Sequence, residues 1–275
     1  MTRSFVVALT AIFLTTAGIA PDARAADTTP VATILCYHEV DDAPTHTTVP
    51  RRGAAESGKN EQLRYTASRG NFRAQLDYLT ANDYSVIPFS DLVDHLAGRK
   101  ATLPPRAVVI TVDDGWACAY SDILPEMQKR GMPFTLFAYP KIVGRGTHAV
   151  TWEQLSKMAQ AKGVEIGSHS FTHPFLTLKN NKKVQAAEYD AFLKHELLDS
   201  RTRLQQATGK PVRYLCYPFG DYDASVASAA STFGYEAAVT TERGVITRAT
   251  PLMQLKRYLI HNDTTLEQFK TFLLP

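Results

Sequence analysis

Short apolar runs rich in β-branched residues alternate along this chain with amphipathic stretches, and this alternation limits the folds that the chain can adopt. The runs have the length of single strands, and the stretches between them repeat their apolar residues with a helical period. Such an order predicts βα units, and therefore a parallel sheet or a (β/α) barrel. The predicted strands span residues 32–37, 84–87, 107–112, 134–139, 164–168, 214–217, 236–240 and 257–260.

Start and stop signals mark the helices between these strands. Capping boxes are predicted to begin at Thr151 and Thr264, and Asp223 is placed to cap another helix. Gly163 and Gly209 are placed to end two helices. The chain of 275 residues shows no internal repeat, no low-complexity tract and no interdomain linker, so we expect one domain after the N-terminal segment.

The N-terminus has the pattern of a secretory signal. Arg3 precedes an apolar run over residues 5–20, and the segment that follows ends in Ala23-Arg24-Ala25. We therefore expect a signal peptide over residues 1–25, a mature domain over residues 26–275, and a secreted or periplasmic location. The run is short beside the roughly 20 apolar residues that cross a bilayer, which favours a cleaved signal. No second long apolar stretch follows, so no stable membrane span is expected after cleavage. An uncleaved anchor is the alternative.

Composition excludes several classes of protein. Hydrophobic residues make up 44% of the chain and charged residues 21%, which excludes a disordered chain. Lys and Arg number 30 against 27 Asp and Glu, a formal net charge of +3. This balance is not that of a protein that binds nucleic acid or a membrane surface. Nothing in the sequence indicates an oligomer.

The cysteines are Cys36, Cys118 and Cys216, and they show no spacing typical of a zinc finger. An oxidising compartment would permit one disulfide and leave one thiol over. All three lie among apolar or small residues, which favours buried thiols, and the sequence does not decide their pairing.

Two adjacent carboxylates follow the apolar strand predicted over residues 107–112. Asp113 and Asp114 precede Gly115, which allows a sharp turn. In a parallel barrel the carboxyl ends of the strands form the active-site face, where one carboxylate can bind a metal while the other acts as a base. A solvated turn is the alternative, since Asp41-Asp42 is a similar pair that does not follow such a strand.

Two histidines follow the strand predicted over residues 164–168. His169 and His173 are four residues apart, and their imidazoles can converge on one divalent ion. The spacing alone is common, but its place at a second strand end favours a metal site. One carboxylate and two histidines would leave a coordination position open for water, as in catalytic sites.

Two further strand ends carry candidate residues. His38 follows the first strand and would lie on the same rim of the barrel, although a lone histidine is more often structural. Tyr217 and Phe219 flank Pro218 after the strand over residues 214–217, and they could form a rigid apolar wall against a sugar ring. A turn with packed aromatic side chains is the alternative.

These strand ends carry the motifs T-V-D-D-G, H-S-F-T-H-P and Y-P-F-G. Their order resembles the NodB-type polysaccharide deacetylases, carbohydrate esterase family 4, whose motifs are T-F-D-D-G, H-[ST]-x-x-H-P and R-x-P-x-G. The resemblance runs from about Val31 to Phe272 and implies an α/β fold, a distorted (β/α)7-type barrel in a single domain. It also implies metal-dependent removal of acetyl groups from an acetylated polysaccharide.

The opening I-L-C-Y-H-E-V-D-D and the ending L-K-R-Y-L-I-H-N-D-T-T-L-E-Q-F resemble the deacetylases of poly-β-1,6-N-acetylglucosamine. The resemblance implies these roles: Asp113 as general base; Asp114, His169 and His173 as metal ligands; the Tyr217 N–H, beside Pro218, at the oxyanion; and His38 as general acid, with His261 as second choice. Zinc is the expected ion, and nickel, cobalt and iron remain open.

The chain also departs from the family pattern. The arginine of the third motif is Cys216 here, and the usual aspartate–tryptophan motif is not recognisable. Both losses also occur in the poly-N-acetylglucosamine branch. A peptidoglycan or chito-oligosaccharide deacetylase remains an alternative, as does an inactive barrel that binds glycans. A metal-dependent phosphoesterase is disfavoured because it would need more carboxylates.

Overall fold

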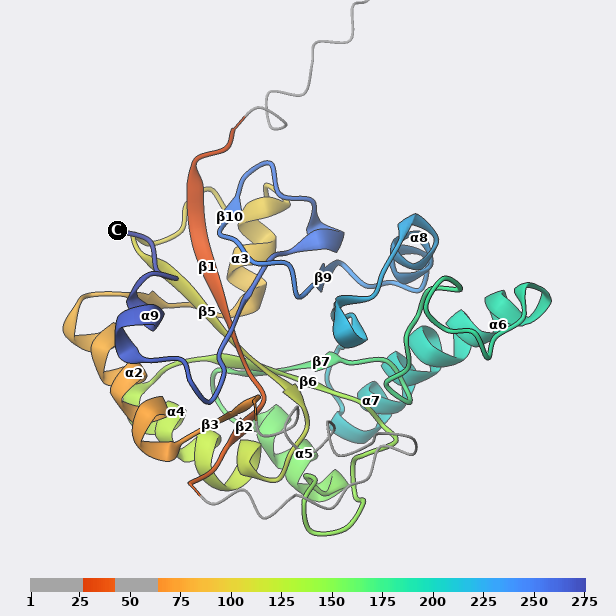
Figure 1. Ribbon diagram of the computed structural model, residues 1–275, viewed down its shortest axis with the longest axis horizontal. Helices are drawn as coiled ribbons and strands as arrows, with labels where there is room; N and C mark the ends of the chain where they lie inside the picture. Colours follow the sequence, from red (N-terminus) through yellow and green to blue (C-terminus); the bar gives the residue numbers. More distant parts are fainter. Residues whose placement is uncertain (1–26, 43–63) are drawn as a thin grey trace, which may run out of the picture.

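The computed structural model describes residues 27–42 and 64–275, so the predicted signal peptide lies outside the described residues. One curled sheet has the order β10-β1-β5-β6-β7-β8-β9, with β11 added to β1 and β4 added to β5 (Figure 1). A separate small sheet pairs β2 with β3. The strands are β1 Pro30–Tyr37, β2 Glu39–Val40, β3 Thr66–Ala67, β4 Ser85–Val86, β5 Ala107–Asp114, β6 Phe134–Ala138, β7 Val164–Ser168, β8 Tyr214–Cys216, β9 Ala237–Val239, β10 Ile246–Thr247 and β11 Tyr258–Leu259.

Each strand predicted from the sequence overlaps a strand of the structure, and the pairings of these strands with one another are parallel. The sequence missed β2, β3 and β10, each of two residues. A strand of two residues shows no alternation, so pattern analysis could not detect these three.

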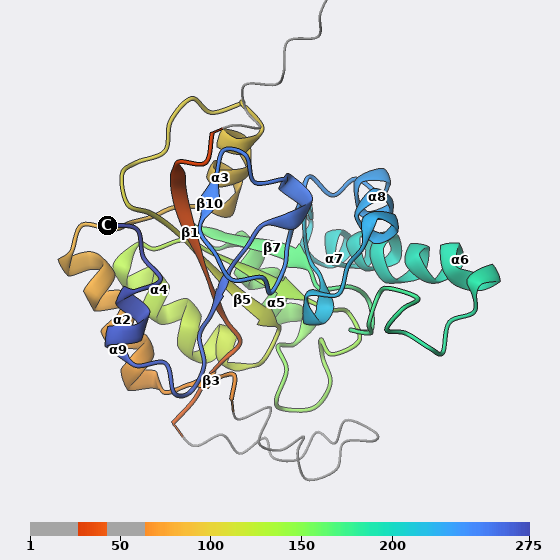
Figure 2. The ribbon, with the colours of Figure 1, turned by 45° about the horizontal axis from the view of Figure 1, so that its top comes forward.

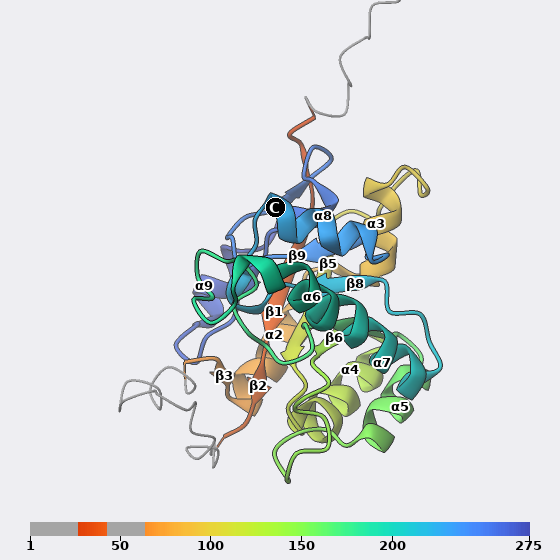
Figure 3. The same ribbon diagram turned by 90° about the vertical axis from the view of Figure 1, so that its right-hand side faces the viewer.

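Helices follow the strands, and most lie outside the curled sheet, whereas Phe89, Leu92 and Val93 of α3 pack with residues on its inner side. Figure 1 shows α2, α4 and α5 along one side of it, and Figure 3 shows α7 beside α5. A π-helical stretch over Lys194–Asp199 joins α7 to α6, which extends away from the sheet (Figure 2). The helices are α2 Arg69–Ala81, α3 Phe89–Leu96, α4 Leu124–Arg130, α5 Trp152–Gln160, α6 Tyr189–Leu193, α7 Ser200–Thr208, α8 Ala224–Thr232 and α9 Leu266–Lys270. In the described ranges, none of the helices has the length and apolarity that a membrane crossing needs.

Local signals explain where several helices begin. The capping box at Thr151 and the cap at Asp223 are confirmed. The box predicted at Thr264 is wrong by one residue, because Thr265 caps α9 and pairs with Gln268. The Thr264 hydroxyl instead accepts a hydrogen bond from the backbone N–H of His261.

Side chains along each strand alternate between the inside of the curled sheet and the helices outside it. On β5, Val108, Ile110 and Val112 belong to the cluster that packs against the helices, whereas Val109 belongs to the inner cluster. This alternation places Asp113 on the inner side, at the carboxyl end of the strand. The same period places Cys36 of β1 and Cys216 of β8 in the inner cluster or beside it.

The segment that contains β11 connects the two ends of the curled sheet. Leu255 bridges to Val239 of β9, and Tyr258 pairs with Leu35 of β1. The expected distorted barrel is thus confirmed, and its last segment places the side chain of Arg257 inside it, where the side chain is 1% exposed.

Candidate active site

The candidate residues from the sequence meet at one edge of the sheet. Asp113 and Asp114 end β5, His38 comes directly after β1, and His169 comes directly after β7. Because these strands are parallel, their carboxyl ends lie on the same rim of the barrel. The structure therefore brings together side chains that are up to 135 residues apart in sequence, from His38 to His173.

Asp114, His169 and His173 present three ligand atoms to one point. Asp114 Oδ1 lies 3.6 Å from His169 Nε2 and 3.5 Å from His173 Nε2, and the two Nε2 atoms are 3.2 Å apart. A tetrahedral zinc ion with bonds of about 2.0–2.1 Å spaces its ligand atoms by roughly 3.3–3.4 Å. The donor set and its spacing therefore fit a divalent ion of this kind.

Hydrogen bonds from neighbouring groups orient these ligand atoms. His169 Nδ1 lies 2.8 Å from the backbone oxygen of Cys216, so Nδ1 donates and Nε2 is left as an acceptor facing Asp114. The indole N–H of Trp116 donates to Asp114 Oδ2 at 3.0 Å, which turns Oδ1 toward the histidines. Trp116 was not predicted from the sequence, because a tryptophan after a turn has no metal-binding signature.

Backbone strain is concentrated at this rim. Among the described residues, six that are not glycine have a positive φ, and four of them are Asp114 (76°), Ser170 (62°), His173 (61°) and Phe219 (61°). A residue with a side chain adopts this conformation only where surrounding contacts hold it. Because these residues cluster at the rim, holding their side chains in place costs some local backbone stability.

The buried side chain of Glu196 supplies part of that restraint. Its carboxylate accepts hydrogen bonds from the backbone N–H groups of Phe171 and Thr172, at 2.9 and 2.8 Å, and from the Thr172 hydroxyl at 2.7 Å. These bonds fix the loop that lies between His169 and His173. Glu196 comes from the π-helical stretch before α7, so its role could not be predicted from the motif itself.

Arg257 holds Asp113 by two parallel hydrogen bonds. Its guanidinium donates to Oδ1 at 2.9 Å and to Oδ2 at 2.8 Å, and both side chains are nearly inaccessible to solvent. Burial would raise the pKa of Asp113, but the nearby Arg257, His169 and His38 outweigh it and hold that pKa well below its usual range. Asp113 is therefore an ionised carboxylate that can accept a proton.

Two cysteine thiols contact the same carboxylate. The Sγ atoms of Cys36 and Cys216 each lie 3.3 Å from Asp113 Oδ2. Burial raises the pKa of both thiols well above the ordinary value, so both stay protonated and donate. The structure has all three cysteines of the chain as thiols. Cys36 and Cys216 are buried as favoured from the sequence, whereas Cys118 is half-buried.

Arg257 is a further residue of the site that was not predicted from the sequence. Cys216 stands where the family motif has an arginine, and a guanidinium nitrogen of Arg257 lies 3.1 Å from its Sγ atom. A cation therefore reaches Asp113 from another strand segment, beside the thiol that replaces the motif arginine. An arginine directly before the apolar run Tyr258-Leu259-Ile260 was the available signal, since an arginine buried with that strand requires an anionic partner.

His38 and His261, the two candidates for general acid, lie at different distances from Asp113. His38 Nε2 is 4.0 Å from Asp113 Oδ2. The ring of Tyr65 packs against both histidines, with ring centroids 4.8 Å from His38 and 5.2 Å from His261. His261 makes no ion pair with Asp113 in the described part of the chain, and burial and nearby Arg64 lower its pKa.

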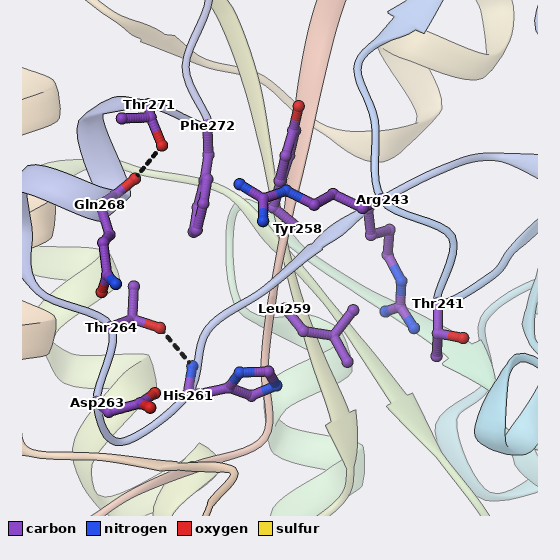
Figure 4. Close-up of a pocket in the computed structure, with 11 residues that line it drawn as sticks. Thr241, Arg243, Tyr258, Leu259, His261, Asp263, Thr264, Gln268, Thr271 and Phe272 are labelled. Carbon is purple, nitrogen blue, oxygen red and sulfur yellow. Dashed lines mark hydrogen bonds between the residues drawn. The ribbon is translucent and has the colours of Figure 1, made fainter.

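A pocket of about 390 Å³ adjoins this side of the site. Figure 4 shows His261 at its edge and the Arg243 side chain beside Tyr258 and Phe272. The Arg243 guanidinium lies 5.2 Å from the Tyr258 ring centroid and 4.8 Å from that of Phe272. Arg257 also lines this pocket, so its side chain lies between the pocket and Asp113.

Of the three residues expected to form the aromatic wall, Tyr217 and Pro218 are buried and Phe219 is exposed. Because Cys216 points inward, Tyr217 points outward, where its ring is fully buried and stacks on Tyr222. Its backbone N–H donates to Val239 O at 3.2 Å, so the predicted oxyanion role would require this bond to open. Pro218 is also buried, and Phe219 is the aromatic residue of this segment that reaches the surface.

Comparison with known proteins assigns the chain to a family. The sequence profile described as polysaccharide deacetylase matches residues 100–238, just over half of the chain. The Bacillus subtilis protein YxkH, whose name refers to the same family, is 30% identical over 186 residues, which cover 68% of this chain and 62% of YxkH. This chain therefore spans less than two thirds of that relative.

Two further comparisons agree. The poly-β-1,6-N-acetyl-D-glucosamine N-deacetylase of Staphylococcus epidermidis is 23% identical over 212 residues, covering 75% of this chain and 72% of that protein. The solved structure of the Streptococcus pyogenes deacetylase PplD in complex with acetate superposes with a TM-score of 0.73 at 22% identity, covering 90% of this chain and 100% of that one. The second comparison concerns the fold. On the profile match and the motifs that it contains, this chain belongs to the polysaccharide deacetylase family.

Proposed function

We propose that this protein is a metal-dependent N-deacetylase that removes acetyl groups from N-acetylglucosamine units of an extracellular or periplasmic polysaccharide. The observation that carries the proposal is the meeting of two groups of side chains on one rim. Asp114, His169 and His173 present three ligand atoms within 3.6 Å of one another. Asp113 lies next to them, ionised and fixed by Arg257.

The three ligand residues would hold a divalent ion, with zinc the first choice for two imidazoles and a carboxylate. A bound ion of this kind polarises an acetyl carbonyl and lowers the pKa of a water molecule. The donor types do not exclude nickel, cobalt or iron.

The residues beside the ligands would move the protons. Asp113 accepts a proton from the attacking water as the new C–O bond forms. His38, 4.0 Å from Asp113, is close enough for both groups to reach one amide, and it gives a proton to the nitrogen as the C–N bond breaks. The products are acetate and a free amine. Arg257 donates to Asp113, to the Cys216 thiol, to the Thr111 hydroxyl and to the Thr240 backbone oxygen. It would therefore act on the reaction through Asp113, as a positioning residue.

The proposed substrate is a polymer like poly-β-1,6-N-acetylglucosamine. The name of the Staphylococcus epidermidis relative and the motifs around His38 and Arg257 support this choice. Peptidoglycan and chito-oligosaccharides would use the same metal site, and they are the alternatives to test. The predicted signal peptide of residues 1–25 supports secretion, with the domain of residues 26–275 as the mature protein.

Acetate release by the purified mature protein tests the proposal. We expect release from poly-β-1,6-N-acetylglucosamine that a chelator abolishes and added zinc restores. Faster release from chitin oligomers or peptidoglycan fragments would change the assigned substrate and keep the reaction. Glycan binding without acetate release from any of them would identify an inactive binding barrel instead.

A further inference from the structure

We propose that Phe175 and Phe219 form a stacking platform, the aromatic ledge, for the pyranose ring of a sugar unit adjacent to the one being deacetylated. This inference rests on the proposed function and adds a second sugar subsite to it. The two residues lie on different loops, after β7 and after β8.

The ledge is exposed although it is apolar. Phe175 is 42% exposed and Phe219 is 37% exposed, and they are the large hydrophobic residues that stand out as exposed in the described part of the chain. Their ring centroids are 4.5 Å apart with an interplanar angle of 33°. Single exposed apolar residues need no explanation, but a contiguous exposed pair at a functional rim is typical of a binding surface.

The ledge also adjoins the candidate metal ligands. The Phe219 ring packs edge-on against His173, with centroids 4.6 Å apart. His173 Nε2 in turn lies 3.5 Å from Asp114 Oδ1. A sugar chain whose acetyl group reaches the ligand atoms would therefore place its next unit over the phenylalanine rings.

Hydrogen bonds from a buried carboxylate tie the two loops together. Asp221, which follows Phe219 closely, accepts from the backbone N–H and the hydroxyl of Thr177, at 2.8 and 3.0 Å. It also accepts from the side-chain amide of Asn180. The Phe175 backbone oxygen accepts from the side-chain amide of Asn181 at 2.9 Å. The loop that carries Phe175 is thus fixed to the loop that carries Phe219.

The backbone at Phe219 is also restrained. Its φ is 61°, and Gly220 follows with a φ of 68°. A Cβ atom at Gly220 would lie 2.1 Å from the Thr241 hydroxyl oxygen, so only glycine fits. A platform that is ordered before the ligand arrives loses little conformational entropy on binding, which favours affinity.

The chemistry of the ledge suits a neutral sugar ring. With centroids 4.5 Å apart and a tilt of 33°, the two rings cover each other's facing sides, so the outer face of the more exposed Phe175 ring offers the flat apolar area and Phe219 supports it. A pyranose ring has C–H faces of similar polarity with hydroxyl groups at its edge. Both phenylalanines lack a polar atom, so they would hold the ring by its faces and leave its hydroxyl groups in water. The occupant is therefore the uncharged ring of an N-acetylhexosamine.

Chain-length dependence tests the ledge. In the wild-type protein, kcat/KM for acetate release should rise from the N-acetylglucosamine monomer to the β-1,6-linked pentamer, because only the longer chain covers the second subsite. Phe175→Leu and Phe219→Leu should each reduce the ratio of pentamer to monomer kcat/KM by about tenfold. Phe175→Tyr should keep the ratio, since it retains an aromatic face. Phe233→Leu, a partly exposed phenylalanine at the end of α8, is the matched control.

Calorimetric binding of the same pentamer separates this inference from the proposed function. Loss of pentamer affinity in Phe175→Leu, with retention in Phe175→Tyr, would support the ledge even if no protein released acetate. Equal pentamer affinity and equal ratios in all variants would overturn the ledge while acetate release stood. A loss of equal size on the monomer and the pentamer would also overturn it, because the ring would then act only by supporting His173.

Discussion

The guanidinium of Arg257 and the carboxylate of Asp113 form a bidentate ion pair inside the barrel, with N–O distances of 2.9 and 2.8 Å. The two residues are far apart in sequence, and they meet because β11 pairs with β1 beside β5. The pair keeps Asp113 ionised in surroundings that would otherwise favour its protonated form.

Replacement of Arg257 by Met should destabilise the protein. It leaves a buried carboxylate without its cation, and breaking a buried pair in this way costs about 3–5 kcal/mol in the free energy of unfolding. Urea denaturation at pH 7 measures the free energy of unfolding of both proteins. Arg213→Met, which removes a partner of the more exposed Glu236, is the control and should cost about 1 kcal/mol or less. Equal losses in the two variants would contradict the account.

The difference in the free energy of unfolding between wild type and Arg257→Met should depend on pH in one direction. The pKa of Asp113 is lower in the folded protein than its ordinary value of about 4. The stabilisation by the pair is therefore fully present above pH of about 4 and decreases as the pH falls toward the folded-state pKa. The gap between wild type and Arg257→Met in denaturation experiments should narrow in acid. A gap that widens below pH 4 would show that the carboxylate is not the partner that matters.

The thiols beside Asp113 should be unreactive. Burial raises the pKa of Cys36 and Cys216 well above the ordinary range and that of Cys118 to about 12. A thiol reagent should label the folded protein slowly and label all three cysteines after denaturation without reductant. Recovery of a single thiol after denaturation would show that two of the cysteines had formed a disulfide.

The choice between His38 and His261 as general acid can be made by chemistry. His38→Ala should bind metal normally and lose about 10²–10⁴-fold in amide hydrolysis, because the leaving amine lacks its proton. The loss should be much smaller on an activated ester, whose leaving group needs no proton. His261→Ala on the same two substrates is the control. An amide-selective loss in His261→Ala, with His38→Ala unaffected, would move the acid to the later motif.

Trp116→Phe should weaken metal binding without removing a ligand. The substitution keeps an aromatic ring and deletes the N–H that donates to Asp114 Oδ2. Removing an outer hydrogen bond of this type reduces metal affinity about 10–100-fold. Competition with a fluorescent zinc chelator measures this affinity, and wild-type affinity in the variant would show that Asp114 is oriented by other contacts.

The sequence was sufficient for eight of the strands along the chain and for the candidate residues at their carboxyl ends. A continuous apolar run such as residues 107–112 predicts a buried strand by itself. The D-D and H-x-x-x-H pairs come directly after two such strands, so their place at the strand ends could be predicted. Tyr217 was assigned to the wrong surface because the letters alone did not give the register of β8, which turns Cys216 inward.

Arg257 and Glu196 could not be assigned roles from the sequence. Each acts on a residue that is distant along the chain, and only the closure of the sheet and the packing of the helix before α7 bring them to the site. A local pattern specifies which residues end a strand, but it does not specify which side chains arrive from elsewhere to support them.

Metal content and acetate release, measured on the same preparations, test the central claim most directly. Wild type should bind one divalent ion per chain and release acetate from poly-β-1,6-N-acetylglucosamine. Asp114→Ala, His169→Ala and His173→Ala should each lose both the ion and the activity, because each removes one of three ligands. Asp113→Asn should keep the ion and lose most turnover, since an amide cannot take the proton. Full metal occupancy in the three ligand variants, or wild-type turnover in Asp113→Asn, would contradict the account.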